Sequence, residues 1–213
     1  MRRWTITFRE ATSPITGHVT KFGGQPSWLT EPVWPLSAST GEAMRFIGQV
    51  ALDPVIFGDV AARMAYLFIT DPMDDYVDET WDANSGENAV VLQPGTYHRA
   101  STADATGPSL YRMVPGGPAG QMTAQPCEFE AILVPEEESD AEEAGENGSG
   151  NKVGGKPWFI QGPEYPDEGG TWRLLLQLDS TTVPFYVNFG DAGIGYAFLS
   201  DDGERAGFLW QCA

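Results

Sequence analysis

The stretch Lys21-Phe22-Gly23-Gly24-Gln25-Pro26-Ser27-Trp28 returns later in the chain as Lys152-Val153-Gly154-Gly155-Lys156-Pro157-Trp158-Phe159. Two further motifs return in the same order. Arg45 to Val50 corresponds to Arg173 to Leu178, and Tyr66 to Asp71 corresponds to Tyr196 to Asp201, at nearly the same spacing. Ordered motifs at a nearly constant spacing indicate an internal duplication. We therefore expect two related units with a surface or cleft between them.

An acidic stretch divides the two units. Residues 135–151 are rich in acidic and small residues and show no apolar periodicity, which is typical of a solvated linker. We therefore expect one duplicated domain over residues 1–213, with repeat 1 over about 15–134 and repeat 2 over 152–213.

The pattern of apolar residues favours a β-rich α+β fold. Short runs of aromatic and branched residues alternate with turn signals from 25 glycines and 16 prolines. We expect two pseudo-symmetric β units with long loops and one or two short helices, the best helix candidate being Pro54 to Met64 with Asp53 as its N-cap. The expected strands are Trp4 to Phe8, Arg45 to Ala51, Ala65 to Thr70, Ala89 to Leu92, Leu110 to Val114, Cys127 to Val134, Trp172 to Leu178, Val183 to Asn188, Ile194 to Ser200 and Gly207 to Gln211. Whether the units share one sheet stays open.

The composition excludes several classes of function. The chain has 30 acidic and 12 basic residues and a formal charge of -18, which argues against nucleic-acid binding and fits attraction to a basic partner. No apolar run reaches the ~18 residues of a membrane helix, and no signal-peptide core follows Met1. Cys127 and Cys212 are too few for a disulfide scaffold, and we expect both to be reduced. These features predict a cytoplasmic protein without membrane contact.

Two pairs of residues in the repeated motifs are candidate binding groups. Trp28 and Trp158 follow the Gly-Gly turns, where they either pack against their own unit or form, with Trp34, a rim that grips a peptide. Gln49 and Gln177 stand inside apolar strands, where an unpaired amide costs about 1–3 kcal/mol. Each amide therefore bonds the backbone of its own unit or lines the cleft between the units.

No motif predicts catalysis or metal binding. Gly190-Asp191-Ala192-Gly193-Ile194-Gly195 looks like a phosphate loop, but strand-like residues follow it where a helix is needed, so a turn is favoured. The acidic residues between Asp71 and Glu79 lack the EF-hand pattern and indicate a solvated loop. His18 and His98 are the only histidines, and no catalytic constellation surrounds either. We expect no cofactor, no metal and no enzymatic activity.

An ordered set of motifs covering nearly the whole chain resembles the YwqG-like bacterial family, a domain of unknown function. The motifs are Lys21-Phe22-Gly23-Gly24-x-Pro26, Trp34-Pro35, Met44-x-Phe46-x-x-Gln49, Leu175-Leu176-Gln177-Leu178-Asp179, Gly190-Asp191-x-Gly193 and Trp210-Gln211-Cys212. That family is distantly similar to eukaryotic proteins related to programmed cell death protein 2, which escort a ribosomal protein. The resemblance implies protein binding or chaperoning. Some relatives carry a Cys-x-x-Cys-Gly knuckle after the Trp-Pro pair, but Ser37 and Thr40 stand in its place here, so the resemblance implies no zinc site.

Three hypotheses follow for the function. The first is a non-enzymatic binding or chaperone-like module that captures a basic or extended client segment between the units, using Trp28, Trp34, Gln49, Trp158, Gln177 and Asp191. The second is an immunity protein whose negative charge opposes a basic toxin. The third is a small-ligand binder or enzyme with Asp191, Gln49, Gln177 and a histidine around an inter-repeat pocket.

Overall fold

The computed structural model describes residues 2–73, 76–94, 106–116, 120–138 and 148–213. His98 and residues 139–147 of the expected linker lie outside these ranges. The described residues form twelve strands and one short helix. They are β1 (Arg2–Glu10), β2 (Lys21–Gly23), β3 (Arg45–Ala51), α1 (Pro54–Phe57), β4 (Ala62–Ile69), β5 (Asn88–Pro94), β6 (Tyr111–Pro115), β7 (Met122–Pro126), β8 (Glu128–Glu137), β9 (Lys152–Gly154), β10 (Trp172–Asp179), β11 (Ile194–Ser200) and β12 (Ala206–Gln211).

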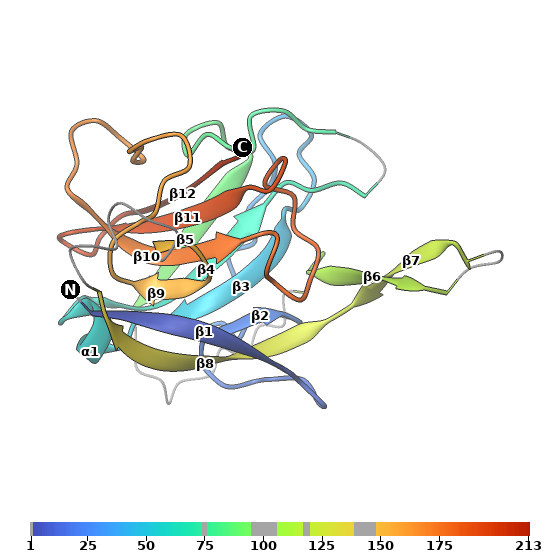
Figure 1. The fold of residues 1–213 in the computed structure, drawn as a ribbon, viewed down its shortest axis with the longest axis horizontal. Helices are drawn as coiled ribbons and strands as arrows, with labels where there is room; N and C mark the ends of the chain where they lie inside the picture. Colours follow the sequence, from blue (N-terminus) through green and yellow to red (C-terminus); the bar gives the residue numbers. More distant parts are fainter. Residues whose placement is uncertain (1, 74–75, 95–105, 117–119, 139–147) are drawn as a thin grey trace.

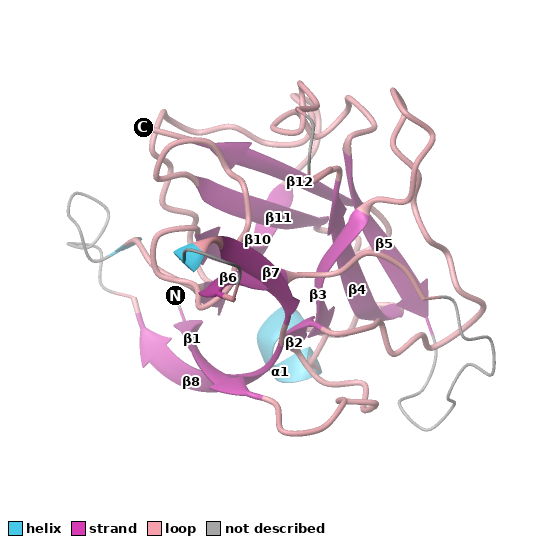
Figure 2. Ribbon diagram, turned by 90° about the vertical axis from the view of Figure 1, so that its right-hand side faces the viewer, coloured by secondary structure: helices cyan, strands magenta, loops and turns pink. Residues whose placement is uncertain are grey.

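Ten strands form a single antiparallel sheet in the order β12-β11-β10-β9-β1-β8-β2-β3-β4-β5. The β1–β8 pair lies in the middle, with β2 to β5 on one side and β9 to β12 on the other (Figure 1). The sheet curls until β5 and β12 contact each other, which gives a nearly closed, barrel-like shape (Figure 2). The remaining strands, β6 and β7, form a ribbon that projects from this body (Figure 1). The two sides of the sheet are therefore continuous, which answers the question that the sequence left open.

The two sides of the sheet match in detail. We call β2 to β5 with their connecting loops the first half, and β9 to β12 with theirs the second half. Lys21 pairs with Gln49 between β2 and β3, and Lys152 pairs with Gln177 between β9 and β10. The register shifts after Phe46 in β3 and after Leu174 in β10. The repeated sequence motifs thus occupy equivalent places in the sheet.

Among the residues that the structure describes, three apolar clusters hold the fold together. The concave face of the sheet encloses side chains from both halves, including Phe22, Ile47, Leu175 and Phe208, all 0–1% exposed. The opposite face of each half carries its own cluster, which the loop after β2 or β9 covers. Burial of this apolar surface is the main force that closes the sheet. The space between the two halves is therefore a shared core.

Several expected elements differ from the structure. The helix ends at Phe57 because Gly58 follows with φ of 68°, although Asp53 caps it as expected by accepting the N–H of Val55 at 2.8 Å. The segment Val183 to Asn188 is not a strand, since only Tyr186 forms an isolated bridge. Its alternation arises because it buries Phe185 and Val187 in the shared core while the residues between stay exposed. In the part of the chain that the structure describes, no helix is long and apolar enough to cross a membrane.

Candidate functional site

The repeated Lys-x-Gly-Gly motifs build a buried ion pair in each half. Lys21 Nζ lies 2.6 Å from a carboxylate oxygen of Glu128, at the start of β8. Lys152 Nζ lies 3.4 Å from a carboxylate oxygen of Glu138, just beyond the end of β8. Burial lowers the pKa of Lys21, while the bond and charge of Glu128 oppose that shift. β8 thus supplies a carboxylate to each half from its opposite ends.

The second glycine of each motif makes room for the carboxylate. Gly24 has φ of 64°, and a Cβ there would lie 2.3 Å from the carboxyl group of Glu128. Gly155 has φ of 77°, and a Cβ there would lie 2.5 Å from Glu138 Oε1. Both the left-handed backbone and the close approach require glycine. The Lys-x-Gly-Gly motif therefore forms a turn and also leaves the space that a buried carboxylate occupies.

The repeated glutamines bind backbone groups of their own halves. Gln49 accepts the N–H of Ser27 at 2.8 Å and donates to the carbonyl oxygen of Val19 at 2.9 Å. Gln177 accepts the N–H of Trp158 at 2.8 Å and donates to the carbonyl oxygen of Gly150 at 2.9 Å. Both side chains are fully buried. These contacts correspond to the first of the two roles that the sequence allowed for the amides.

The aromatic residues match between the halves by their distance along the chain from Lys21 and Lys152 rather than by residue type. Trp28 packs on Tyr66, with ring centroids 4.6 Å apart, and Phe159 packs in the same way on Tyr196 at 5.1 Å. The counterpart of Trp28 is therefore Phe159, whereas the counterpart of Trp158 is Ser27.

The same spacing links Trp34 to Tyr165. The ring of Trp34 meets Phe68 edge-on at 5.3 Å, and the ring of Tyr165 meets Phe198 edge-on at 5.3 Å. The sequence pattern missed Tyr165 because it differs in type from Trp34. The constant spacing from the two repeated lysines was the signal that could have found it.

The structure does not bring the six predicted site residues together. Trp28, Trp34 and Gln49 lie in the first half, with Trp28 buried and the Trp34 indole N–H bonded to Met44 O at 2.8 Å. Trp158 and Gln177 lie in the second half. Asp191 is exposed in the loop before β11, where its carbonyl oxygen accepts the N–H of Ala213. Of the six, only Trp158 lines the cavity described next.

A cavity of about 420 Å³ opens on the outer face of the second half. We call it the second-half cavity. Its lining combines aromatic rings and prolines with three cationic side chains and one carboxylate. The lining residues are Arg3, Glu138, Gly148, Lys152, Lys156, Pro157, Trp158, Phe159, Gly162, Pro163 and Tyr165. A concave, mostly apolar site with few polar groups is typical of a binding pocket.

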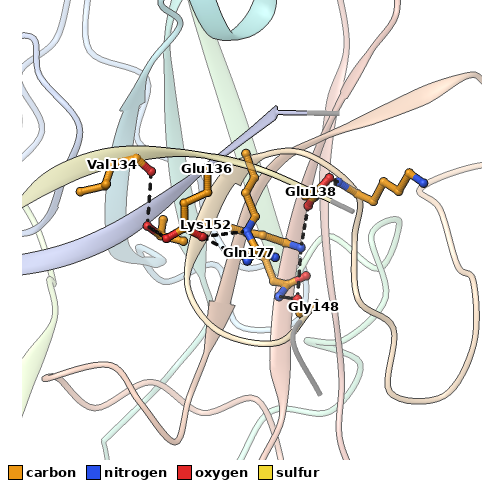
Figure 3. Close-up of polar contacts among 9 residues, drawn as sticks. Val134, Glu136, Glu138, Gly148, Lys152 and Gln177 are labelled. Atoms are coloured by element: carbon orange, nitrogen blue, oxygen red, sulfur yellow. Dashed lines mark hydrogen bonds and ion pairs between the residues drawn. The ribbon is translucent and has the colours of Figure 1, made fainter. Parts of the chain in front are cut away.

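Polar contacts hold the charged side of this cavity in place (Figure 3). Lys152 lies between Glu138 and the carbonyl oxygen of Gly148, to which it donates at 3.1 Å. The Glu138 carboxylate also accepts the backbone N–H of Lys156 at 3.0 Å. Arg3 of β1 forms an ion pair with Glu136 at 3.1 Å. Strands β1, β8 and β9 therefore fix the charges around the cavity.

The loop around Ser37, for which the sequence predicts no zinc site, is organised by a buried carboxylate. Ser37 donates its hydroxyl to Glu87 at 2.7 Å, and the backbone N–H of Ser39 donates to the same carboxylate at 2.8 Å. Burial opposes ionisation of Glu87, but the bonds from Ser37 and Ser39 outweigh it and lower the pKa. Among the described residues, no group of three or more His, Cys, Asp or Glu side chains is placed to hold a metal ion.

The chain matches the model of a known protein family. The model of a family described as a domain of unknown function (DUF1963) matches residues 20–212. No curated protein matches the chain. The matched range begins just before β2, so it contains both Lys-x-Gly-Gly motifs and nearly all of the second-half cavity, but not β1 with Arg3.

Proposed function

The chain belongs to the family described as a domain of unknown function (DUF1963), and we propose that it is a non-enzymatic protein-binding module that captures an extended client segment in the second-half cavity. The observation that supports this proposal is the lining of the cavity. Trp158, Phe159 and Tyr165 contribute aromatic side chains to the lining, and Pro157 and Pro163 contribute rigid apolar ones. Aromatic-lined grooves of this kind bind extended peptide segments.

The polar groups of the cavity support binding rather than turnover. Lys152 and Glu138 are side chains with 3% and 6% exposure that bond each other and nearby backbone groups. Side chains held in this way shape the walls of the site, whereas a general base must itself reach the proton that it takes from a substrate or nucleophile. The module is therefore expected to release its client unchanged.

The charge of the chain supports a client that is basic as a whole. A formal charge of -18 attracts a positively charged protein over long distances and raises the rate of encounter. Screening by salt weakens this attraction. Both cysteines are free, which supports a cytoplasmic site of action.

Site-specific photo-crosslinking tests the proposal. Tyr165, which is 44% exposed at the cavity, is replaced by p-benzoylphenylalanine in cells of the source organism, and Tyr76, which is 73% exposed in the first half, is the matched control. We expect a discrete protein adduct from the Tyr165 position that weakens at high salt. Equal adducts from both positions, or none from Tyr165, would contradict a client site in this cavity.

We also propose that the two halves arose by internal duplication. The mirrored strand order supports this origin, as do the matched contacts of Gln49 and Gln177. Tyr66 and Tyr196 add a further match, because their hydroxyls donate to the carbonyl oxygens of Ser27 and Trp158, the same residues whose N–H groups bind the two amides. Unrelated segments have no physical reason to share all these contacts in one order and at nearly one spacing.

A further inference from the structure

The β6–β7 ribbon has one apolar face and one mostly polar face. Side chains alternate between the two faces of a strand, and the pairing of Met113 with Ala124 fixes which residues of the two strands share a face. The apolar face consists of Tyr111, Met113, Pro115, Met122, Ala124 and Pro126. The opposite face consists of Arg112, Val114, Thr123 and Gln125. In antiparallel sheets this alternation is typical of a strand pair with one face packed against another layer.

Much of the apolar face of the ribbon is exposed. Met113 is 43% exposed and Met122 is 51% exposed, and Pro115 between them on this face is exposed as well. The ribbon stands out from the body of the molecule, away from the barrel-like sheet (Figure 1). The face therefore has the composition of a buried surface, but the described residues leave it facing solvent.

Contacts at its base fix the ribbon to the body. Arg112 forms an ion pair with Glu10 of β1 at 2.9 Å. Tyr186 donates its backbone N–H to the carbonyl oxygen of Tyr111 at 2.8 Å, and the two rings stack with their centroids 5.2 Å apart. The ring of Tyr186, which is 40% exposed, extends the apolar face onto the body. These contacts hold the ribbon in one direction, so its apolar face stays directed to solvent.

The edges of the ribbon are poor sites for adding a further strand. The backbone N–H of Gly116 donates to the carbonyl oxygen of Gln121, which fixes by alternation the backbone groups that point outward. Pro115 is one of the outward positions on β6, and Pro126 is one on β7. Proline has no N–H, so each edge lacks a donor that an added strand would need. The apolar face, rather than an edge, is therefore the surface that suits a partner.

The distribution of charge favours a second copy of the chain as that partner. Residues 113–127 contain no Asp, Glu, Lys or Arg, although the chain has 30 acidic residues. A basic client would find no carboxylate on this face. Two copies of formal charge -18 repel each other, and the repulsion is weakest where neutral ribbons keep the bodies apart. An uncharged apolar face also packs against its own copy without burying an unpaired charge.

We infer that the chain forms a symmetric dimer in which the apolar faces of two β6–β7 ribbons pack against each other. Each face then supplies the layer that the alternation of the other requires, as in twofold interfaces where one patch meets itself. The six residues of the face are far fewer than the roughly 20–30 residues per side of a standard interface, so the dimer is weak and forms at high concentration. This contact is separate from the client site in the second-half cavity.

Analytical ultracentrifugation of the full chain tests the inference. We expect the average mass to rise from 23.1 kDa towards twice that value over about a thousandfold increase in concentration. Added salt should strengthen the association, because it screens the repulsion between two acidic bodies, whereas it weakens the attraction of a basic client. A mass that stays at 23.1 kDa at every concentration, with and without added salt, would overturn the dimer.

Matched variants show whether the apolar face makes the contact. Met113→Glu and Met122→Glu each place a carboxylate on this face and should raise the dissociation constant of the dimer at least about tenfold, since a buried charge without a partner is costly. Thr123→Glu adds the same charge to the opposite face of the same ribbon and should change the constant little. Urea denaturation checks that each variant is folded. Equal weakening by Thr123→Glu and Met122→Glu, or no weakening by either methionine variant, would overturn packing through this face.

Discussion

Gln49 and Gln177 hold equivalent positions on the two sides of one sheet, and each accepts a backbone N–H at 2.8 Å from the loop that covers its own half. Each amide also donates to two carbonyl oxygens of the segment before its Lys-x-Gly-Gly motif. The amides therefore join three segments of chain in each half. Their role is to hold the loops that shape the surface above them.

Replacing either amide by leucine should destabilise the fold to a similar extent. Gln49→Leu and Gln177→Leu each leave one N–H and two carbonyl groups without their partner at buried or partly buried contacts, and such groups cost about 1–3 kcal/mol each when they are buried and unsatisfied. We expect the free energy of unfolding, measured by urea denaturation, to fall by about 2–4 kcal/mol in each variant. Gln121→Leu, at an exposed position, should change it by less than about 0.5 kcal/mol. A large difference between the two buried variants would contradict equivalent roles.

Alanine at Gly24 should be more damaging than alanine at Gly41, which also has a left-handed backbone. Gly41 has φ of 72° and no atom within 4 Å of the point where a Cβ would lie, so Gly41→Ala should cost only the backbone strain of about 1–2 kcal/mol. Gly24→Ala adds a clash with Glu128, which should cost a further ~1–3 kcal/mol. In a Glu128→Ala background, the extra penalty should disappear from the double-mutant cycle. An unchanged penalty there would show that the carboxylate is not its cause.

Cys127 should resist alkylation in the folded protein. Burial raises the pKa of its thiol to about 11, so about one molecule in a thousand carries the reactive thiolate at pH 8. The side chain is also only 8% exposed. A short pulse of iodoacetamide followed by mass spectrometry should label Cys212 first and label Cys127 only in denaturant. Equal labelling of both cysteines without denaturant would contradict the packing around β8.

The stabilisation from Glu87 should depend on pH. Its folded pKa lies below the unfolded value of about 4.3, so the contribution is present above that pH and is lost as the pH falls through the folded pKa. Glu87→Gln should therefore lower the free energy of unfolding by about 1–3 kcal/mol at pH 7, and by clearly less at pH 3. Glu42→Gln, exposed in the loop that Glu87 holds, should have little effect at either pH. A pH-independent loss would contradict the role of the charge.

The sequence predicted the long paired strands well and the short ones poorly. Apolar periodicity located β3 and β11 with their observed bounds, because both are long and buried on both faces. It missed β2 and β9, since three residues ending in glycine carry no period. The segment at Val183 shows the opposite error, because alternating burial against a core imitates the pattern of a paired strand.

The cavity was harder to predict than the fold. Matching by residue type linked Trp28 to Trp158, whereas contacts link Trp28 to Phe159. Arg3 reaches the cavity from a strand outside the repeats, through pairing between β1 and β9 that no local pattern encodes. A site assembled from distant strands depends on how those strands pair. In this sequence only the repeated motifs gave information about strand pairing.

The central place of β1 has a consequence for how the chain folds. β1 precedes both of its partners, and the pairing of Arg2 with Glu137 and of Thr5 with Lys152 spans most of the chain. During synthesis the first half can pair its own strands early. In contrast, β1 stays unpaired until first β8 and then β9 have been synthesised. Contacts of such wide separation slow folding and expose unpaired edges to aggregation. The strand that joins the halves in the finished molecule is thus the one that stays exposed longest while the molecule is made.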